Sequence, residues 1–150
     1  MKSIIIVALL AAFAFAEEEV VVLTDGNYEE MIRNNSVVML EFYAPWCGHC
    51  KELAPEYEKM AKDVKEKKKN FIIAKLDATA NPKAASKFGV RGYPTLKLFI
   101  NGSPLDYDGD RKADPILAFI EKKVLPPSVE LKTASEIKER HETKGRKVRK

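Results

Sequence analysis

The spacing of apolar residues changes several times along the chain, and each change indicates a new element. Nearly continuous apolar runs of strand length predict strands buried on both faces, at residues 20–23, 37–43, 71–76 and 95–100. Helical spacing or helix-start signals predict helices at residues 27–32, 47–69, 81–88 and 114–123. Since strands and helices alternate, we expect a parallel β-α-β core.

Helix and turn signals refine these boundaries. Asn27, Asn81 and Asp114 precede or open predicted helices and are expected to cap them. Pro55 lies inside the long second helix and is expected to kink it. Asn101-Gly102 is typical of a tight turn and predicts an antiparallel hairpin between residues 95–100 and 104–107. The predicted fold class is therefore α/β, with a central mixed β-sheet flanked by helices.

The first 16 residues have a different pattern. Lys2 precedes an apolar run from Ile4 to Phe15, which ends in the small-x-small sequence Ala14-Phe15-Ala16. The run is shorter than the roughly 20 residues that cross a bilayer. We expect a removed secretory signal peptide and no transmembrane anchor. A buried amino-terminal strand or helix is the alternative.

The last 25 residues also stand apart. Pro126-Pro127 stop the preceding helix, and the segment after them has too few apolar residues to form a core. The 150-residue chain is thus divided into a signal peptide (1–16), one folded domain (17–125) and a basic tail (126–150). The tail is expected to be a solvated, flexible end. Binding to acidic proteins or anionic lipid is the alternative.

Charge and composition narrow the possible functions. Hydrophobic residues make up 45% and charged residues 32%, which is ordinary for a folded domain. The net charge of +4 comes from the two ends, because residues 17–125 sum to −1. A folded domain without a basic face argues against nucleic acid as a partner.

The strongest chemical signal is a pair of cysteines in Trp46-Cys47-Gly48-His49-Cys50-Lys51, where a predicted strand leads into a helix. The helix start, free backbone N–H groups, the partner thiol and a protonated His49 are expected to lower the pKa of Cys47. We predict that Cys47 faces solvent and attacks disulfides, and that Cys50 lies behind it and resolves the mixed disulfide. Since His49 favours the thiolate, the pair is expected to donate disulfides.

Three other uses of the cysteines are possible. A structural zinc site needs four ligands, and only His49 and His141 are further candidates of the usual soft type, so no metal is expected. A structural disulfide closing so small a loop would add only about 2 kcal/mol. Two free buried cysteines fit poorly with the polar residues around them and with the export signal.

Residues 41–51, Glu41-Phe42-Tyr43-Ala44-Pro45-Trp46-Cys47-Gly48-His49-Cys50-Lys51, resemble the active-site segment of a protein disulfide isomerase catalytic domain. Similar segments follow in the family's order at 75–79, 89–95 and 107–111, so the resemblance covers about residues 20–124. It implies a thioredoxin fold and thiol-disulfide oxidoreductase and isomerase activity. The disulfide Cys47/Cys50 would be the redox centre, without a metal or a dissociable cofactor.

The resemblance also implies roles for residues around the cysteines. Glu41 matches a buried acid beneath Cys50 that shuttles its proton, and Lys75 matches the partner of that acid in a buried charge pair. Pro94 matches a cis-proline facing the disulfide, which leaves the backbone of Tyr93 free to pair with an extended substrate. An exposed Glu41 at a sheet edge is the alternative.

Further members of the predicted site lie within or near the motif. Gly48 and His49 separate the cysteines, and Trp46 is expected to contact unfolded substrate. Arg111 matches an arginine that swings toward the active site and lowers the pKa of the resolving thiol. An ordinary exposed loop arginine is the alternative.

The resemblance implies that cysteine-containing or unfolded secretory polypeptides are substrates, and that glutathione or an upstream oxidase exchanges electrons with the pair. A monomer in the lumen of the endoplasmic reticulum is expected. Secretion is the alternative, because the chain ends in Arg149-Lys150 rather than a retrieval signal. Residues from Pro127 onward are similar to the opening of a following non-catalytic domain, which is the pattern expected of a truncated form or a minimal relative of a longer protein.

Two questions stay open from the sequence. Asn34 and Asn101 both begin glycan acceptor patterns, whose occupancy the sequence does not decide. A chaperone-like module that holds unfolded chains around Trp46 and Pro94 is the second hypothesis for the function, although the intact cysteine pair weighs against it.

Overall fold

The computed structural model describes residues 19–124. Within this range the chain forms five strands and four helices. In chain order they are β1 (Val21–Leu23), α1 (Tyr28–Asn34), β2 (Val37–Tyr43), α2 (Gly48–Glu66), β3 (Ile72–Asp77), α3 (Pro82–Lys87), β4 (Thr95–Ile100), β5 (Ser103–Tyr107) and α4 (Ala113–Val124). Every predicted strand and helix is confirmed, with shifts of a few residues at the ends.

The strands form one mixed sheet in the order β1-β3-β2-β4-β5. β1, β3 and β2 run parallel, whereas β4 and β5 are antiparallel to their neighbours. β2 is the central strand, and its first six residues are fully buried, as its apolar run predicts. The carboxyl end of β2 leads directly into the cysteine motif and α2, so the sheet centre positions the site.

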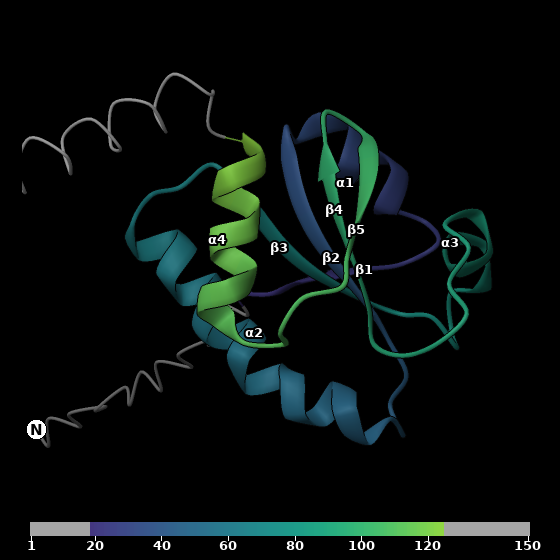
Figure 1. Cartoon of the computed structure of the whole chain (residues 1–150). Helices are drawn as coiled ribbons and strands as arrows, with labels where there is room; N and C mark the ends of the chain where they lie inside the picture. The colour runs from purple at the N-terminus through teal and green to yellow at the C-terminus, as the bar shows by residue number, and fades with distance from the viewer. Residues whose placement is uncertain (1–18, 125–150) are drawn as a thin grey trace, which may run out of the picture.

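Helices cover both faces of the sheet. α2 and α4 pack on one face, where buried residues of β2 and β4 such as Met39 and Leu98 join Tyr57 and Ile116 in one core cluster. α1 and α3 cover the opposite face, where Tyr28, Ile32 and Ala84 belong to a second cluster. Figure 1 shows α2 beside α4 on one side of the strands and α3 on the other.

The hairpin between β4 and β5 forms where Asn101-Gly102 predicts it. Both residues have positive φ, +48° at Asn101 and +83° at Gly102. A two-residue turn with positive φ at both positions matches the twist of the strands, and glycine reaches this region without a steric cost. The predicted turn is confirmed.

The predicted caps are wrong in their contacts. Asn27 accepts a hydrogen bond from the backbone N of Thr24 (2.7 Å) and forms no side-chain cap. Asn81 likewise does not cap α3, because its Oδ1 accepts from the backbone N of Asp25 at 2.7 Å. Asp25 returns the interaction by accepting from the backbone N of Ala84 at 2.8 Å. The amino terminus of α3 is thus held by a residue 59 positions earlier.

The last helix also starts differently. α4 begins at Ala113, and Asp114 lies in its first turn instead of before it. The backbone N of Ala113 donates to a carboxylate oxygen of Glu56 at 3.0 Å. Pro55 lies inside α2, which continues to Glu66.

The predicted signal peptide (1–16) and the whole of the predicted tail (126–150) lie outside the described residues. Between residues 19 and 124, no helix has the length and apolar character needed to cross a membrane.

Candidate active site

The two cysteines lie at the amino terminus of α2 and form a disulfide, with their Cα atoms 5.3 Å apart. After β2 ends, the backbone N of Cys47 donates to the carbonyl of Ala44 (3.1 Å), which closes a tight turn. Cys47 is the residue that caps α2, and its Sγ accepts a hydrogen bond from the backbone N of Cys50 at 3.2 Å. After reduction, this N–H and the positive end of the helix would stabilise a thiolate at Cys47.

The expectation that Cys47 faces solvent is wrong for the disulfide form. Cys47 is 7% exposed and Cys50 is 5% exposed, so the two hardly differ. Ala44 shares their small buried cluster, and Tyr43 and Tyr93 pack against it. Both cysteines are therefore largely shielded from solvent in the disulfide form.

His49 lies in the first turn of α2 and is largely exposed. Its Nδ1 is 3.1 Å from Oε2 of Glu52, one helical turn further along. An acid three residues further along a helix lies on the same surface, so the carboxylate of Glu52 contacts the imidazole directly. Gly48 is exposed too, and a Cβ added to it would meet open space.

An aromatic pair forms the rim of the disulfide cluster. Trp46 is 72% exposed, and its ring lies edge-on to that of Tyr93 with centroids 5.8 Å apart. The peptide bond between Tyr93 and Pro94 is cis, and Pro94 is buried. The structure thus brings Trp46 and Tyr93 together beside the cysteines.

Glu41 lies on β2 and is only 4% exposed, so the alternative of an exposed edge residue is wrong. Burial raises the pKa of Glu41 to about 7, and the positive charge of Lys75 partly opposes this rise. A carboxyl group with a pKa close to neutral can both accept and release a proton under physiological conditions.

Lys75 is the direct neighbour of Glu41 on β3, because the two residues are register partners in the parallel β2–β3 pair. Residues opposite each other in adjacent strands point to the same face. Lys75 is half-buried, however, and within residues 19–124 the two side chains form no ion pair. The predicted fully buried pair is therefore present as neighbouring charges without direct contact.

Arg111 is exposed on the segment between β5 and α4 and makes no ion pair within the part of the chain described. It lines a cavity of about 340 Å³ together with His49 and Glu52 of α2. It also lines a second cavity, of about 370 Å³, that includes Pro94. Arg111 thus lies between the start of α2 and the cis-proline segment, as both interpretations of this arginine allow.

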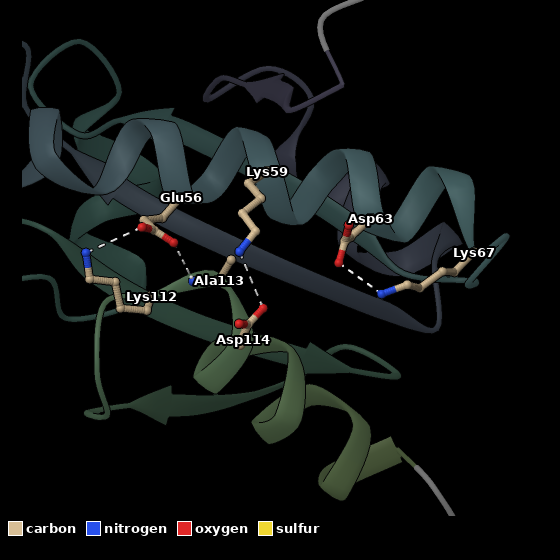
Figure 2. A network of polar contacts seen from close by, with 7 residues as sticks. All are labelled: Glu56, Lys59, Asp63, Lys67, Lys112, Ala113 and Asp114. Atoms are coloured by element: carbon tan, nitrogen blue, oxygen red, sulfur yellow. Dashed lines mark hydrogen bonds and ion pairs between the residues drawn. The ribbon is translucent and has the colours of Figure 1, made fainter.

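Contacts between α2 and α4 hold this segment in place. The carboxylate of Glu56 on α2 accepts from the backbone N of Ala113 at 3.0 Å and lies 3.4 Å from Nζ of Lys112. Figure 2 shows Glu56 bridging to both residues, with the pair Lys59–Asp114 one turn further along α2. The hydrogen bond from Ala113 and, to a lesser extent, Lys112 lower the pKa of Glu56. The contacts of Glu56 with Lys112 and Ala113 thus fix the chain immediately after Arg111.

Sequence reasoning missed Glu52 and Glu56 as supporting residues. Glu52 was detectable, because an acid three positions after His49 on a predicted helix lies on the same face. Glu56 had no comparable signal, since its partners Lys112 and Ala113 are 56 and 57 residues away. Between residues 19 and 124, no three or more His, Cys, Asp or Glu side chains form a group that could hold a metal ion.

Comparison with known proteins identifies the class of this site. Residues 19–122 match the thioredoxin family model, so the chain belongs to the thioredoxin family. The family accounts for the mixed sheet, the flanking helices and the cysteine pair at the start of α2.

Among its relatives are protein disulfide isomerases. The chain is 48% identical over 120 residues to protein disulfide-isomerase of Drosophila melanogaster, a match that covers 80% of this chain and 24% of the relative. It is 45% identical over 122 residues to human protein disulfide-isomerase A4, covering 81% of this chain and 19% of the relative. The match thus spans about a quarter or less of the length of these curated relatives.

Solved structures agree with this assignment. The first thioredoxin domain of mouse protein disulfide-isomerase A4 superposes with a TM-score of 0.68 at 47% identity, covering 74% of this chain and 79% of that one. Human ERp44 in a zinc-bound form gives the same TM-score at 28% identity, covering 72% of this chain and 32% of that one. The predicted fold and family resemblance are confirmed.

Proposed function

We propose that this chain is a thiol-disulfide oxidoreductase and isomerase that forms and rearranges disulfide bonds in proteins of the secretory pathway. The observation that carries the proposal is the Cys47–Cys50 disulfide at the amino terminus of α2, with the N–H of Cys50 donating to Cys47 Sγ. Since relatives named protein disulfide-isomerase are 42–48% identical to this chain, the same chemistry is the natural inference.

In the oxidising direction, a substrate thiolate attacks Sγ of Cys47 and breaks the Cys47–Cys50 bond. Cys50 leaves as a thiolate and takes up a proton. A second substrate thiolate then attacks the substrate sulfur of the mixed disulfide, which forms the substrate disulfide and releases Cys47 as a thiolate. The two electrons that the substrate thiols lose are now held by the reduced cysteine pair, and glutathione disulfide or an upstream oxidase removes them.

Rearrangement begins with the reverse of the last oxidising step. The Cys47 thiolate attacks a substrate disulfide, forms a mixed disulfide and releases one substrate thiolate. That thiolate attacks another disulfide of the substrate, and the thiolate released there attacks the substrate sulfur of the mixed disulfide, which completes the rearrangement and frees Cys47 as a thiolate. Alternatively, Cys50 attacks Cys47 Sγ and frees the substrate in reduced form. Attack by Cys50 requires its proton to leave, and the buried Glu41 carboxyl, with its pKa of about 7, is the proposed acceptor.

The surrounding residues have supporting roles in this proposal. Trp46, Tyr93 and Pro94 form the substrate face, and the exposed Trp46 ring offers apolar contact to an unfolded chain. His49 stabilises the Cys47 thiolate, and Arg111, whose segment borders α2, modulates Cys50. Residence in the endoplasmic reticulum as a monomer, with cysteine-containing polypeptides as substrates, completes the proposal.

Single cysteine variants test the assigned roles. With a fluorescent disulfide peptide, Cys50→Ser is expected to accumulate a mixed disulfide through Cys47, because the resolving thiol is missing. Cys47→Ser is expected to form no such adduct. Mass spectrometry after acid trapping measures both, and equal adducts on the two variants would overturn the assignment.

The exposure of Trp46 favours a second candidate function, binding of unfolded chains without turnover. A double variant, Cys47→Ser with Cys50→Ser, separates the two functions. Loss of thiol exchange together with loss of protection against substrate aggregation supports the enzyme alone. Unchanged protection that disappears when Trp46→Ala is added supports a separate binding function.

A further inference from the structure

In the described part of the chain, two side chains between α2 and the sheet carry buried oxygen atoms without a hydrogen-bond partner: Glu41, the proposed proton acceptor, and Tyr57, which has no role in the site as described so far. Oε1 of Glu41 and the phenol oxygen of Tyr57 are buried and find no hydrogen-bond partner among residues 19–124. Their residues are 4% and 1% exposed. A buried polar group without a partner costs roughly 1–3 kcal/mol, and such groups in native proteins often serve a function.

The fold places both side chains in the same layer. Cys50, Leu53 and Tyr57 follow one another on the buried face of α2, at the spacing of one helical stripe. Side chains on a helix lean toward its amino terminus, so the phenol of Tyr57 leans back toward Cys50.

Glu41 lies under the same stripe. Its neighbour two residues earlier on β2 is Met39, and its partner across β4 is Leu96. Both belong to the core cluster that contains Tyr57, and alternate residues of a strand share a face. The charge of Glu41, after burial itself, raises the pKa of Tyr57, which agrees with their proximity.

We propose that Tyr57 is a positioning residue for Glu41, and that its phenol hydroxyl donates a hydrogen bond to the Glu41 carboxylate when this acid ionises. The inference rests on the proposed function, in which Glu41 accepts the proton of Cys50. Tyr57 is suited to the task, because its raised pKa keeps the hydroxyl protonated and able to donate.

The groups that face Glu41 have separable effects. β3 contributes the positive charge of Lys75, and β4 contributes the apolar Leu96. α4 contributes apolar residues such as Ile116 to the same core cluster. Tyr57 is then the uncharged group that donates a hydrogen bond to Glu41. A donor to the charged form favours ionisation, so it limits the rise in pKa that burial causes.

The direct test is the pKa of Glu41 in Tyr57→Phe, measured from the carboxyl 13C shift in the disulfide form. Removing the hydroxyl is expected to raise this pKa by about one unit, a tenfold change in the ionisation equilibrium. Tyr28→Phe is the matched control, because Tyr28 is buried on the opposite face and its hydroxyl donates to Glu29 at 2.9 Å. An unchanged Glu41 pKa in Tyr57→Phe would overturn the inference.

A second measurement needs no change at Tyr57. In the unmodified protein, the ring carbon that bears the Tyr57 hydroxyl should shift with the same midpoint as Glu41, near pH 7, and in Glu41→Gln this shift should disappear. A ring signal that does not follow Glu41 contradicts the proposal. Both measurements use the oxidised protein without substrate, so a failure of thiol exchange would reject the proposed function and leave this result standing.

A kinetic readout links Tyr57 to the reaction. In Tyr57→Phe, the pH dependence of mixed-disulfide resolution by Cys50 should move upward by the same unit. Combined with Glu41→Gln, the Tyr57 change should have no further effect, because the group it positions is gone. Additive effects of the two substitutions would show that Tyr57 acts by another route.

Discussion

Replacing Glu41 with glutamine should change how the stability of the protein depends on pH. Glu41 is almost completely buried on the central strand, and burial raises its pKa from 4.5 to about 7. In the unfolded chain the same carboxyl returns to its ordinary value. Between these two pH values the folded protein therefore holds a proton that the unfolded chain has released.

The sign and size of the effect follow from this difference. Because the folded state binds more protons, the free energy of unfolding falls as the pH rises through the interval from 4.5 to 7 and levels off above it. Each unit of pKa difference corresponds to about 1.4 kcal/mol, so the full effect is about 3 kcal/mol. This loss of stability is absent below the unfolded-state pKa and complete above the folded-state pKa of Glu41.

Urea unfolding of the disulfide form between pH 4 and pH 8.5 measures the free energy of unfolding as a function of pH. Over this range the free energy of unfolding of Glu41→Gln should rise by about 3 kcal/mol relative to that of the unmodified protein, because glutamine does not titrate. Glu58→Gln, which changes an exposed acid on α2, is the control and should parallel the unmodified protein. If Glu41→Gln also runs parallel, Glu41 is not a buried acid with a raised pKa.

Three further outcomes are expected. Trp46→Ala should raise KM for a peptide disulfide several-fold and leave exchange with glutathione disulfide unchanged in stopped-flow assays, because the exposed ring contacts only the larger substrate; equal effects on both would refute this role. Asp25→Ala should lower the free energy of unfolding by about 1–2 kcal/mol in urea, since α3 loses its cap; no loss would contradict it. At pH 7, Glu56→Gln should have a lower free energy of unfolding than the unmodified protein, because the Ala113 hydrogen bond lowers the pKa of Glu56 and so favours its charged form. This difference should shrink as acid protonates Glu56 in the unmodified protein. A difference that stays constant with pH would show that the charge of Glu56 does not contribute to stability.

Much of the fold was predictable because its signals are local. The apolar run of β2, interrupted only by Glu41, indicated a central strand, and Asn101-Gly102 indicated the hairpin turn. The caps of α3 and α4 were not predictable, because Asp25 and Glu56 reach them across more than 50 residues of sequence. Local propensity does not contain such pairings.

The site also has features that local sequence predicts and features that depend on distant residues. The cysteine pair and its place at a helix start follow from the motif, and the burial of Glu41 follows from its position in an apolar strand. The burial of Cys47 did not follow, because Tyr93, which packs against the disulfide cluster, belongs to a distant segment. The separation of Lys75 from Glu41 depends on side-chain placement that strand register alone does not fix.

The proposed function requires that the Cys47–Cys50 pair is a redox-active disulfide. Its reduction potential, measured by equilibration with glutathione and mass spectrometry after thiol trapping, tests this most directly. A reduction potential of about −180 mV, typical of isomerases, is expected, whereas about −270 mV would indicate a thioredoxin-like reductant. A pair that stays oxidised below about −300 mV would be a structural disulfide, and the proposed function would be wrong.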